Sequence, residues 1–395
     1  MLSRIRKAPP DGLLAAVMLA FLATAGLFYV NIMVALVAGL VDGLGLSDRQ
    51  AGLVASANVY GAAVGALVAV LLVKRVPWRP LAVCALLALI SLDAASILVE
   101  SARPLLVLRF GHGCVGGLLV GTAFAVIART RSPDRTFGML LVVQFGLGGL
   151  GVMVLPRLVP LFGHWVLFAA LMAFSFATLL MVPFLEDYPP GRVPRPAAAS
   201  GKVQWGLLSL TLVAVFLFQA ANMGLAAYLI GLARHYGLET GFASTAIGVA
   251  TWVGIVGPAM VVVFGTRFGR TGPLLAGMAM TLVGTAAFHL SASPWIYLVA
   301  NCLTGITWAF VISYLLGMCA EFDQTGRTAA LGGFVSKLGL ASGPFAGAML
   351  MDSHAYPLLI NAAFIGLAAS VPAMLLPGWL LDRRRAAAAR VSSND

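Results

Sequence analysis

Long apolar stretches alternate with short polar breaks along the whole chain. A helix of about 20 apolar residues crosses the hydrocarbon core of a bilayer, where it satisfies its own backbone hydrogen bonds. The breaks predict twelve such helices, at residues 13–38, 50–73, 79–100, 104–128, 136–160, 164–185, 205–232, 242–266, 273–291, 294–319, 328–351 and 356–381. The pattern therefore predicts an all-α protein that crosses a membrane many times.

The longest polar break lies near the middle of the chain, at Glu186–Lys202. Its sequence, EDYPPGRVPRPAAASGK, combines proline, glycine and charged residues, which is typical of a linker. It divides the predicted helices into two equal sets. We therefore expect an N-terminal six-helix bundle at 1–185, a cytoplasmic linker at 186–203, and a C-terminal six-helix bundle with a short basic tail at 204–395.

Basic residues are distributed unevenly between the two sides of the predicted bundles. With a cytoplasmic N-terminus, nineteen Lys and Arg residues fall in cytoplasmic segments and four in outer loops. Because positive residues concentrate on the cytoplasmic side, both termini are predicted to be cytoplasmic in a multi-pass protein of the bacterial inner (plasma) membrane. The net charge of +11 is thus explained by basic residues that set the orientation in the membrane, and we expect no nucleic-acid partner.

The composition excludes a soluble globular domain. Of the 395 residues, 61% are hydrophobic and 10% are charged, and the mean hydropathy is +0.98. Soluble domains carry roughly 25% charged residues. The sequence has no phosphate-binding loop and no zinc-type motif, and its five histidines share no ligand spacing within one predicted helix. We expect neither an enzyme nor a cofactor or metal site.

The two halves of the chain repeat at a constant offset of 192 residues. The recurring pairs include Gly65 and Gly257, Arg75 and Arg267, and Gly113 and Gly305. A shared register across several helices predicts two pseudo-symmetric six-helix repeats, an architecture found in transporters.

Two loop motifs lie at corresponding places in the two halves, and two further motifs lie within predicted helices. The break after the second predicted helix reads VLLVKRVPWRP, and its counterpart in the second half reads GTRFGRTGP. The fourth predicted helix contains RFGHG at Arg109–Gly113, and the eleventh contains GLASGPFAGA. In these motifs the sequence resembles the major facilitator superfamily over nearly its whole length. RFGHG corresponds to the family pattern Arg-x-x-Gln-Gly with histidine in place of glutamine, and VLLVKRVPWRP to its basic loop motif without the aspartate.

The resemblance implies two six-helix halves that rock around a substrate site near the middle of the membrane. It also implies a gating role for the basic residues of the two loop motifs: Lys74, Arg75, Arg79, Arg267 and Arg270. The antiporter motif of the family's fifth helix is not intact in FGLGGLGVMVLP, and most of its pattern occurs in GLASGPFAGA instead.

Three strongly ionisable residues, Asp93, Arg109 and Lys337, lie deep within predicted helices. Each would cost a few kcal/mol facing lipid. Asp93 and Arg109 are each eight residues from Ser101 in the intervening turn, so both lie about 12 Å below it and an ion pair is expected. The pair is either a structural salt bridge or, as we prefer, a proton-coupling element in which Asp93 is protonated and Arg109 responds. The family resemblance supports that role for Arg109.

Glycines follow Arg109 at every fourth position, at Gly113, Gly117 and Gly121. Residues four apart share a helix face, and small residues allow a second helix to approach closely. Arg109 is therefore expected to point into a helix–helix seam. His112 flanks the same face, either as a hydrogen-bonded core histidine or as a proton relay.

Lys337 is predicted to lie near the bilayer midplane, about 120° around its helix from the row that contains Gly339 and Gly343. We interpret it as a contact for an anionic substrate; the alternative is a structural pairing with a carbonyl group or with an acid such as Asp93. Organic-anion exchangers of the resembled family also carry a lysine on helix 11. Other polar candidates for the substrate site are Gln219, Asn222, Gln144, Asn31, Asn58, Tyr60, Trp252, Asn301, Trp308 and Tyr314.

Any one of these polar residues can instead form a structural hydrogen bond between helices. Gln219 and Asn222, three apart on one helix face, are the best pair for a polar substrate.

The sequence predicts a monomeric, proton-coupled secondary transporter that moves a small organic anion or amphipathic metabolite by alternating access. Its partners would be that substrate, protons and the lipid bilayer. The alternatives are proton-driven efflux of hydrophobic compounds, copper import, and a transporter-like receptor.

Overall fold

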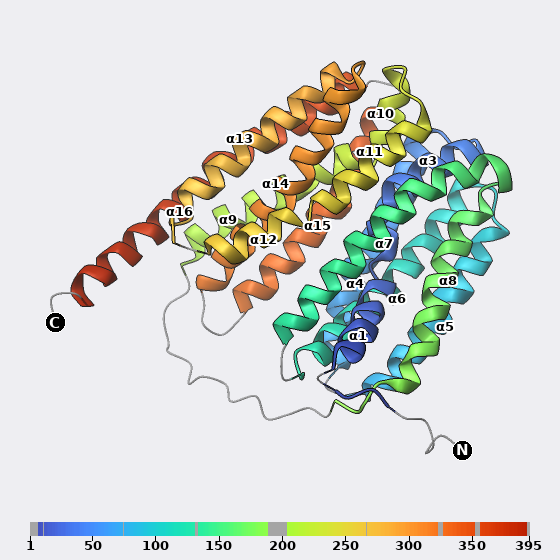
Figure 1. The fold of residues 1–395 in the computed structure, drawn as a ribbon, viewed down its shortest axis with the longest axis horizontal. Helices are drawn as coiled ribbons and strands as arrows, with labels where there is room; N and C mark the ends of the chain where they lie inside the picture. The colour runs from blue at the N-terminus through green and yellow to red at the C-terminus, as the bar shows by residue number, and fades with distance from the viewer. Residues whose placement is uncertain are drawn as a thin grey trace. The chain divides into compact units, whose positions relative to one another are not determined.

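The computed structural model describes residues 7–10, 12–73, 75–130, 133–188, 204–265, 267–322, 327–351 and 356–392 (Figure 1). Across these ranges all regular elements are helices, and no strand occurs. The predicted all-α fold class is confirmed.

The chain divides into two compact units. Unit 1 comprises Met1–Pro194 together with Ala227–Gly231 and Glu239–Gly248, and unit 2 comprises Arg195–Ala226, Leu232–Leu238 and Val249–Asp395. The helices α10 (Leu229–His235) and α11 (Thr240–Val253) are therefore shared between the units. The three-part division expected from the sequence stays a prediction.

Unit 1 contains the first eight α-helices and a short 3-10 helix. They are α1 (Leu13–Ala25), α2 (Phe28–Asn31), α3 (Met33–Leu44), α4 (Asp48–Leu72), α5 (Trp78–Ile97), α6 (Ala102–Ile127), α7 (Pro133–Phe162), α8 (Trp165–Met181) and η2 (Val182–Phe184). Within this unit α6 packs against α4, α5 and α1, and α5 packs against α8. The position of α6 therefore lets one of its residues reach several neighbours.

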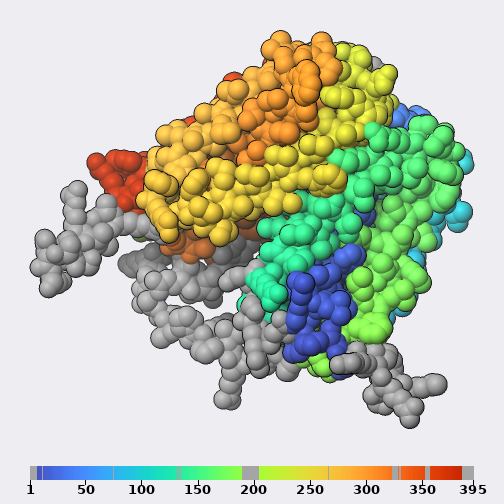
Figure 2. Space-filling model, viewed as in Figure 1, coloured from blue at the N-terminus to red at the C-terminus, as the bar shows by residue number. Residues whose placement is uncertain are grey.

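Unit 2 contains the remaining helices. They are α9 (Trp205–Ala226), α12 (Val256–Phe264), α13 (Thr271–Ala287), η3 (Phe288–Leu290), α14 (Pro294–Glu321), α15 (Arg327–Leu350) and α16 (Tyr356–Ser392). Here α9 packs against α15 and α16, and α13 packs against α14, whose surfaces adjoin in Figure 2. Phe218, Met278 and Leu315 are among the buried residues of its apolar core.

Ten helical segments in the described ranges are long and apolar enough to cross a membrane, and Leu13–Ala25 and Met33–Leu44 are shorter apolar helices. The predicted continuous helix at 13–38 is wrong, because the chain breaks around Gly26 and again at Ile32. At Gly26 the backbone lies so close to α6 that an added Cβ would be 2.3 Å from the carbonyl oxygen of Gly116. Close backbone approach, rather than hydropathy, sets this break.

Two later predicted helices are also divided. The segment predicted at 205–232 separates into α9 and α10, and the segment at 242–266 separates into α11 and α12 near Gly254. Pro258 explains the second break, since proline has no N–H and its ring clashes with the carbonyl four residues earlier. The last helix is longer than the predicted 356–381, and continues through an alanine-rich segment of high helix propensity.

The predicted glycine seam is present between α4 and α6. An added Cβ at Gly113 would lie 1.9 Å from the carbonyl oxygen of Asn58, and one at Gly117 would lie 2.1 Å from that of Ala62. A real Cβ cannot occupy either place unless the helices separate. These glycines therefore set the spacing of α4 and α6.

The same contacts recur in unit 2 at the 192-residue offset, which supports the internal repeat. An added Cβ at Gly65 would lie 1.9 Å from the carbonyl oxygen of Cys114, and one at the equivalent Gly257 would lie 2.2 Å from that of Ile306. Likewise, an added Cβ at Gly113 would lie 1.9 Å from the carbonyl oxygen of Asn58, and one at the equivalent Gly305 would lie 3.1 Å from that of Ala250. The two units thus use equivalent glycines to join equivalent helices.

Replacing Gly113 by alanine is expected to lower the free energy of unfolding by about 1–3 kcal/mol, because overpacking a tight contact outweighs the gain in helix propensity. The measurement is the midpoint of thermal unfolding of the purified protein in detergent. Gly111→Ala is the matched control, since a Cβ at Gly111 meets no atom within 4 Å. Equal midpoints for the two variants would contradict the seam.

Candidate functional site

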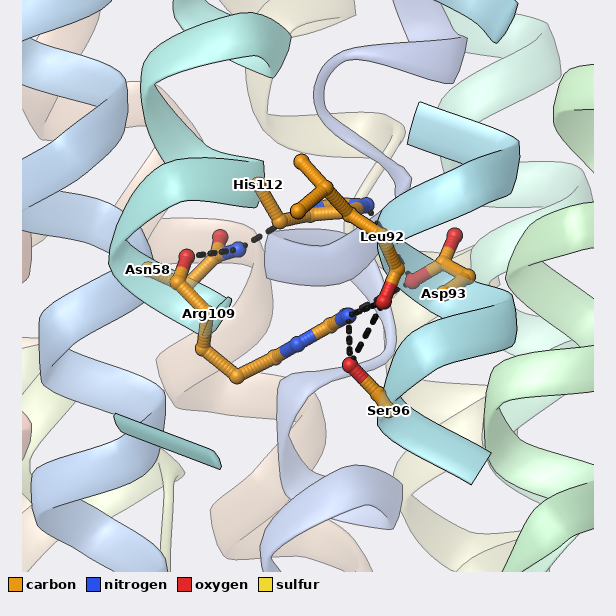
Figure 3. A network of polar contacts seen from close by, with 6 residues as sticks. All are labelled: Asn58, Leu92, Asp93, Ser96, Arg109 and His112. Atoms are coloured by element: carbon orange, nitrogen blue, oxygen red, sulfur yellow. Dashed lines mark hydrogen bonds and ion pairs between the residues drawn. The ribbon is translucent and has the colours of Figure 1, made fainter. Parts of the chain in front are cut away.

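A buried ion pair joins α5 and α6 in the interior of unit 1 (Figure 3). Nη1 of Arg109 donates to Oδ1 of Asp93 at 2.7 Å, and both side chains are 0% exposed. The two residues are equally distant along the chain from Ser101, in the short turn between α5 and α6, and so reach the same depth. The ion pair expected from the sequence is therefore confirmed, and its role is taken up below.

The rest of the guanidinium group has neutral partners. Nη2 of Arg109 donates to the carbonyl oxygen of Leu92 at 3.0 Å and to the hydroxyl of Ser96. That hydroxyl in turn donates to the Leu92 carbonyl at 2.7 Å. The guanidinium carbon also lies 5.0 Å from the ring centre of Phe168 and 6.0 Å from that of Tyr29. Arg109 is thus held by one charged partner and several neutral ones.

Arg109 and the glycines below it face different neighbours. Gly113 and Gly117 lie against α4, whereas the guanidinium of Arg109 reaches α5. The expectation that Arg109 points into a seam is confirmed, but the seam is not the one lined by the glycines. Each step of four residues rotates about 40° around a helix. The row from Arg109 to Gly121 therefore turns gradually around α6, and its members can face two neighbouring helices.

His112 and Asn58 extend the network towards α4 (Figure 3). Nε2 of His112 lies 3.4 Å from Oδ1 of Asp93, and Nδ1 of His112 lies 2.9 Å from Nδ2 of Asn58. Nδ2 of Asn58 also donates to the backbone carbonyl of Arg109 at 3.1 Å. Asn58 was expected to contact substrate, but it is 3% exposed and lies within this network.

Three buried polar atoms around the ion pair have no hydrogen-bond partner among the described residues. They are Oδ2 of Asp93, Nε of Arg109 and the hydroxyl of Tyr29. Arg109 and His112 both approach the other carboxylate oxygen, Oδ1. The arrangement therefore leaves Oδ2 as the atom of Asp93 that is available to a proton.

Lys337 lies half-buried on α15 in unit 2. No ion pair or hydrogen bond joins its side chain to any residue in the described parts of the chain. The glycine row beside it packs on α9: an added Cβ at Gly339 would lie 2.7 Å from the carbonyl oxygen of Phe216, and one at Gly343 would lie 2.5 Å from that of Ala220. The alternative that Lys337 pairs with Asp93 is not borne out, since Asp93 pairs with Arg109.

Gln219 has both ends of its side-chain amide engaged within unit 2. Its amide nitrogen, Nε2, donates to the hydroxyl of Ser336 at 2.7 Å, and its amide oxygen, Oε1, accepts from Nε1 of Trp308 at 2.7 Å. The bond to Ser336 anchors α15 next to Lys337. Gln219 is 2% exposed and links α9, α14 and α15, whereas its expected companion Asn222 bonds to the carbonyl oxygen of Phe218 in its own helix.

The other polar candidates are dispersed. Nδ2 of Asn301 donates to the carbonyl oxygen of Tyr297 in its own helix, and the hydroxyl of Tyr314 donates to the carbonyl oxygen of Gly265. Trp252 is 43% exposed on α11. The remaining three lie partly buried in unit 1 on α2, α4 and α7: Asn31, Tyr60 and Gln144.

The predicted gating residues differ in their contacts. Arg270 pairs with Glu321 of α14, and Arg79 pairs with Asp187 at 3.0 Å. Of the other three, Arg75 and Arg267 are exposed, and Lys74 lies outside the described residues. Sequence reasoning missed these acidic partners, although both acids fall on the same predicted side of the membrane as the basic loops.

Asp382 of α16 is a further residue that the sequence did not single out. Its carboxylate accepts from the backbone N–H groups of Arg270 and Thr271, at 2.9 Å each, and from the hydroxyl of Thr271 at 2.8 Å. It therefore caps the first turn of α13, where the backbone N–H groups have no partner within the helix.

Asp382→Ala is expected to cost about 1–2 kcal/mol of unfolding free energy, as the loss of a helix cap does. The midpoint of thermal unfolding in detergent measures this. Asp187→Ala is the control, because its side chain is 71% exposed and an exposed ion pair contributes less than about 1 kcal/mol. If both variants lose the same stability, Asp382 is not a cap.

Comparison with known proteins places these features in one family. A sequence profile described as Major Facilitator Superfamily matches residues 13–348. Among solved structures, the chain is similar to a D-xylose-proton symporter, with a TM-score of 0.70 and 14% identity over 91% of this chain and 96% of that one.

A second similar structure is a variant of the nucleoside transporter NupG, with a TM-score of 0.64 and 12% identity over 93% of this chain and 98% of that one. No curated protein sequence matches the chain. Since the profile covers most of the chain, the protein is a membrane transporter rather than an enzyme, and it belongs to the Major Facilitator Superfamily.

Proposed function

We propose that this transporter couples the movement of a small organic anion or amphipathic metabolite to protons, with Asp93 as the proton carrier and Lys337 as a substrate contact. The observation that carries the proposal is the fully buried Asp93–Arg109 pair with one free carboxylate oxygen. Ionisable groups within membrane-spanning helices are costly and commonly serve proton or ion pathways.

The internal repeat argues against a purely structural ion pair. Unit 2 carries neutral residues at the positions equivalent to the four network residues of unit 1: Ala250 for Asn58, Thr285 for Asp93, Asn301 for Arg109 and Thr304 for His112. The corresponding helices of unit 2, α13 and α14, pack together without any charge at these positions. The fold therefore does not require an ion pair there, which favours a functional reason for it.

The neutral partners of Arg109 make protonation of Asp93 feasible. A proton bound at Oδ2 removes the negative charge and weakens the bond from Nη1 of Arg109. Nη2 still donates to Leu92 and Ser96, so the guanidinium keeps partners while its counterion is neutral. A group with two acceptable arrangements is the two-state element that coupling needs.

Lys337 supports an anionic substrate. Asp93 and Arg109 cancel each other's charge, whereas Lys337 is half-buried in a membrane helix and forms no ion pair with an acid among the described residues. A cation in that environment attracts an anion more strongly than it would in water. The arrangement therefore favours a carboxylate or similar group on the substrate.

The named activities of similar structures are consistent with part of this proposal. One of them is a proton symporter, so the fold accommodates proton coupling. Their named substrates, a sugar and nucleosides, are neutral, and Lys337 is the reason for proposing an anion here instead.

Flux in proteoliposomes tests the proposal. Vesicles containing the protein and an internal pH-sensitive dye are exposed in turn to benzoate, lactate and succinate, to xylose and uridine as neutral probes, and to tetraphenylphosphonium as a hydrophobic cation. We expect a protein-dependent proton flux with at least one anion and none with the neutral probes. Flux with tetraphenylphosphonium alone would overturn the anion proposal in favour of efflux, and binding without flux would indicate a receptor.

A further inference from the structure

The side-chain amide of Asn58 has only one orientation that satisfies its surroundings. Its nitrogen faces two atoms, the backbone carbonyl oxygen of Arg109 at 3.1 Å and Nδ1 of His112 at 2.9 Å. A carbonyl oxygen can only accept a hydrogen bond, so the NH₂ group and not the amide oxygen must face Arg109. The second hydrogen of the same NH₂ group is then directed at His112.

This orientation fixes the tautomer of His112. With a donor facing it, Nδ1 must be an acceptor and carries no proton. The proton of the neutral ring therefore resides on Nε2, which faces Oδ1 of Asp93 at 3.4 Å. Both sides of the ring agree, since an unprotonated Nε2 would place a lone pair against a carboxylate.

The same geometry opposes a doubly protonated His112. A proton on Nδ1 would face the NH₂ group of Asn58, so two donors would meet at 2.9 Å. Among the described residues, the charged or titratable groups facing His112 are Asp93 on α5, Arg109 on its own helix and Tyr29 on α2, whose ring centre is 6.0 Å away. The element α4 contributes only the neutral Asn58. The positive charge of Arg109 also disfavours an imidazolium.

We infer that Asn58 is a positioning residue that holds His112 as a neutral Nε2–H donor towards Asp93, so that Asp93 alone takes up the transported proton. The inference deepens the proposed proton coupling and rests on it for its functional consequence. His112 then acts through its hydrogen bond and not as a relay, and Oδ2 of Asp93 remains the atom that binds the proton.

The internal repeat agrees with this assignment. The positions equivalent to Asn58 and His112 in unit 2 are Ala250 and Thr304, and the equivalent of Asp93 is Thr285. The Asn58–His112 pair therefore occurs in unit 1, which contains Asp93. It is missing at the equivalent positions of unit 2.

Nitrogen NMR of the full-length protein in lipid tests the tautomer without any substrate. Histidine is labelled with ¹⁵N, and the His112 signals are identified as those lost in His112→Gln. We expect an unprotonated Nδ1 and a protonated Nε2 at every pH at which the protein remains folded. A protonated Nδ1, in either the other tautomer or an imidazolium, would overturn the inference.

Asn58→Asp reverses the constraint, because a carboxylate accepts from Nδ1–H and favours the imidazolium. We expect His112 to gain a second protonation in this variant, and the pH profile of anion-driven proton flux to gain a transition that disappears in Asn58→Asp/His112→Gln. Asn301→Asp is the matched control, a buried asparagine of unit 2 that bonds to its own helix and whose replacement is expected to leave the His112 signals unchanged.

The two readouts separate failure of this inference from failure of the proposed function. If the wild-type tautomer is as expected but no probe drives proton flux, Asn58 orients His112 and the coupling proposal fails. If flux is proton-coupled but His112 titrates in the wild-type protein, the coupling stands and the role of Asn58 is wrong. His112→Gln provides a further check, since glutamine can donate to Asp93 and accept from Asn58 without titrating. It is expected to show the wild-type pH profile even if its rate is lower.

Discussion

Replacing Asp93 by asparagine is expected to abolish accumulation of substrate driven by a pH gradient while leaving exchange of substrate across the membrane. Asparagine keeps an acceptor for Arg109 but cannot bind and release a proton. A gradient of one pH unit, about 1.4 kcal/mol per proton, supports about a tenfold concentration ratio for one coupled proton. In Asp93→Asn that ratio should fall to about one.

Removing one partner of a buried pair can cost several kcal/mol of stability, so the folding of the variant must be checked. Counterflow measures exchange in the same proteoliposomes, and exchange by the variant shows that it is folded. Asp42→Asn is the control, because Asp42 is an exposed residue near the end of α3. If Asp93→Asn still accumulates substrate as the wild type does, the role of the ion pair is structural.

Replacing Lys337 by methionine is expected to weaken binding of an anionic substrate by about 10- to 150-fold. This range corresponds to the loss of one hydrogen bond to a charged group, about 1.5–3 kcal/mol. The measurement is the concentration dependence of anion-driven flux, together with binding to the purified protein. The side chain has no partner among the described residues, so its removal leaves no unpaired group behind.

Lys337→Arg keeps the positive charge and should retain part of the affinity, which separates charge from shape. Thermal stability should be equal or higher in Lys337→Met, because the variant removes a half-buried charge. Unchanged anion affinity in Lys337→Met would remove the main reason for proposing an anionic substrate.

The hydrophobic pattern was sufficient to predict an all-helical membrane protein, but not where the helices break. Hydropathy does not mark the breaks at Gly26 and Ile32, because both residues are uncharged and lie within a long apolar stretch. The break at Gly26 depends on contact with Gly116 of α6, a residue distant in the sequence. The break near Gly254 could have been predicted from Pro258.

The candidate site was predictable where one short turn fixed the geometry. Asp93 and Arg109 are equidistant from Ser101, so their depth follows from the helix rise alone. Their partners on other helices were not predictable in this way. Asn58 was assigned to the substrate and Gln219 to a polar ligand, but both have their amides engaged with residues more than 50 positions away. Such contacts depend on how the helices are rotated against one another.

The central claim, that Asp93 takes up and releases the transported proton, is tested most directly by infrared difference spectroscopy of the protein in lipid. Lowering the pH, or adding the anion that drives proton flux, should change the carbonyl band of a protonated carboxylic acid in the wild-type protein. The change should be missing in Asp93→Asn and present in Asp42→Asn. A band that stays the same across the pH range that drives transport, or a change that persists in Asp93→Asn, would contradict the account.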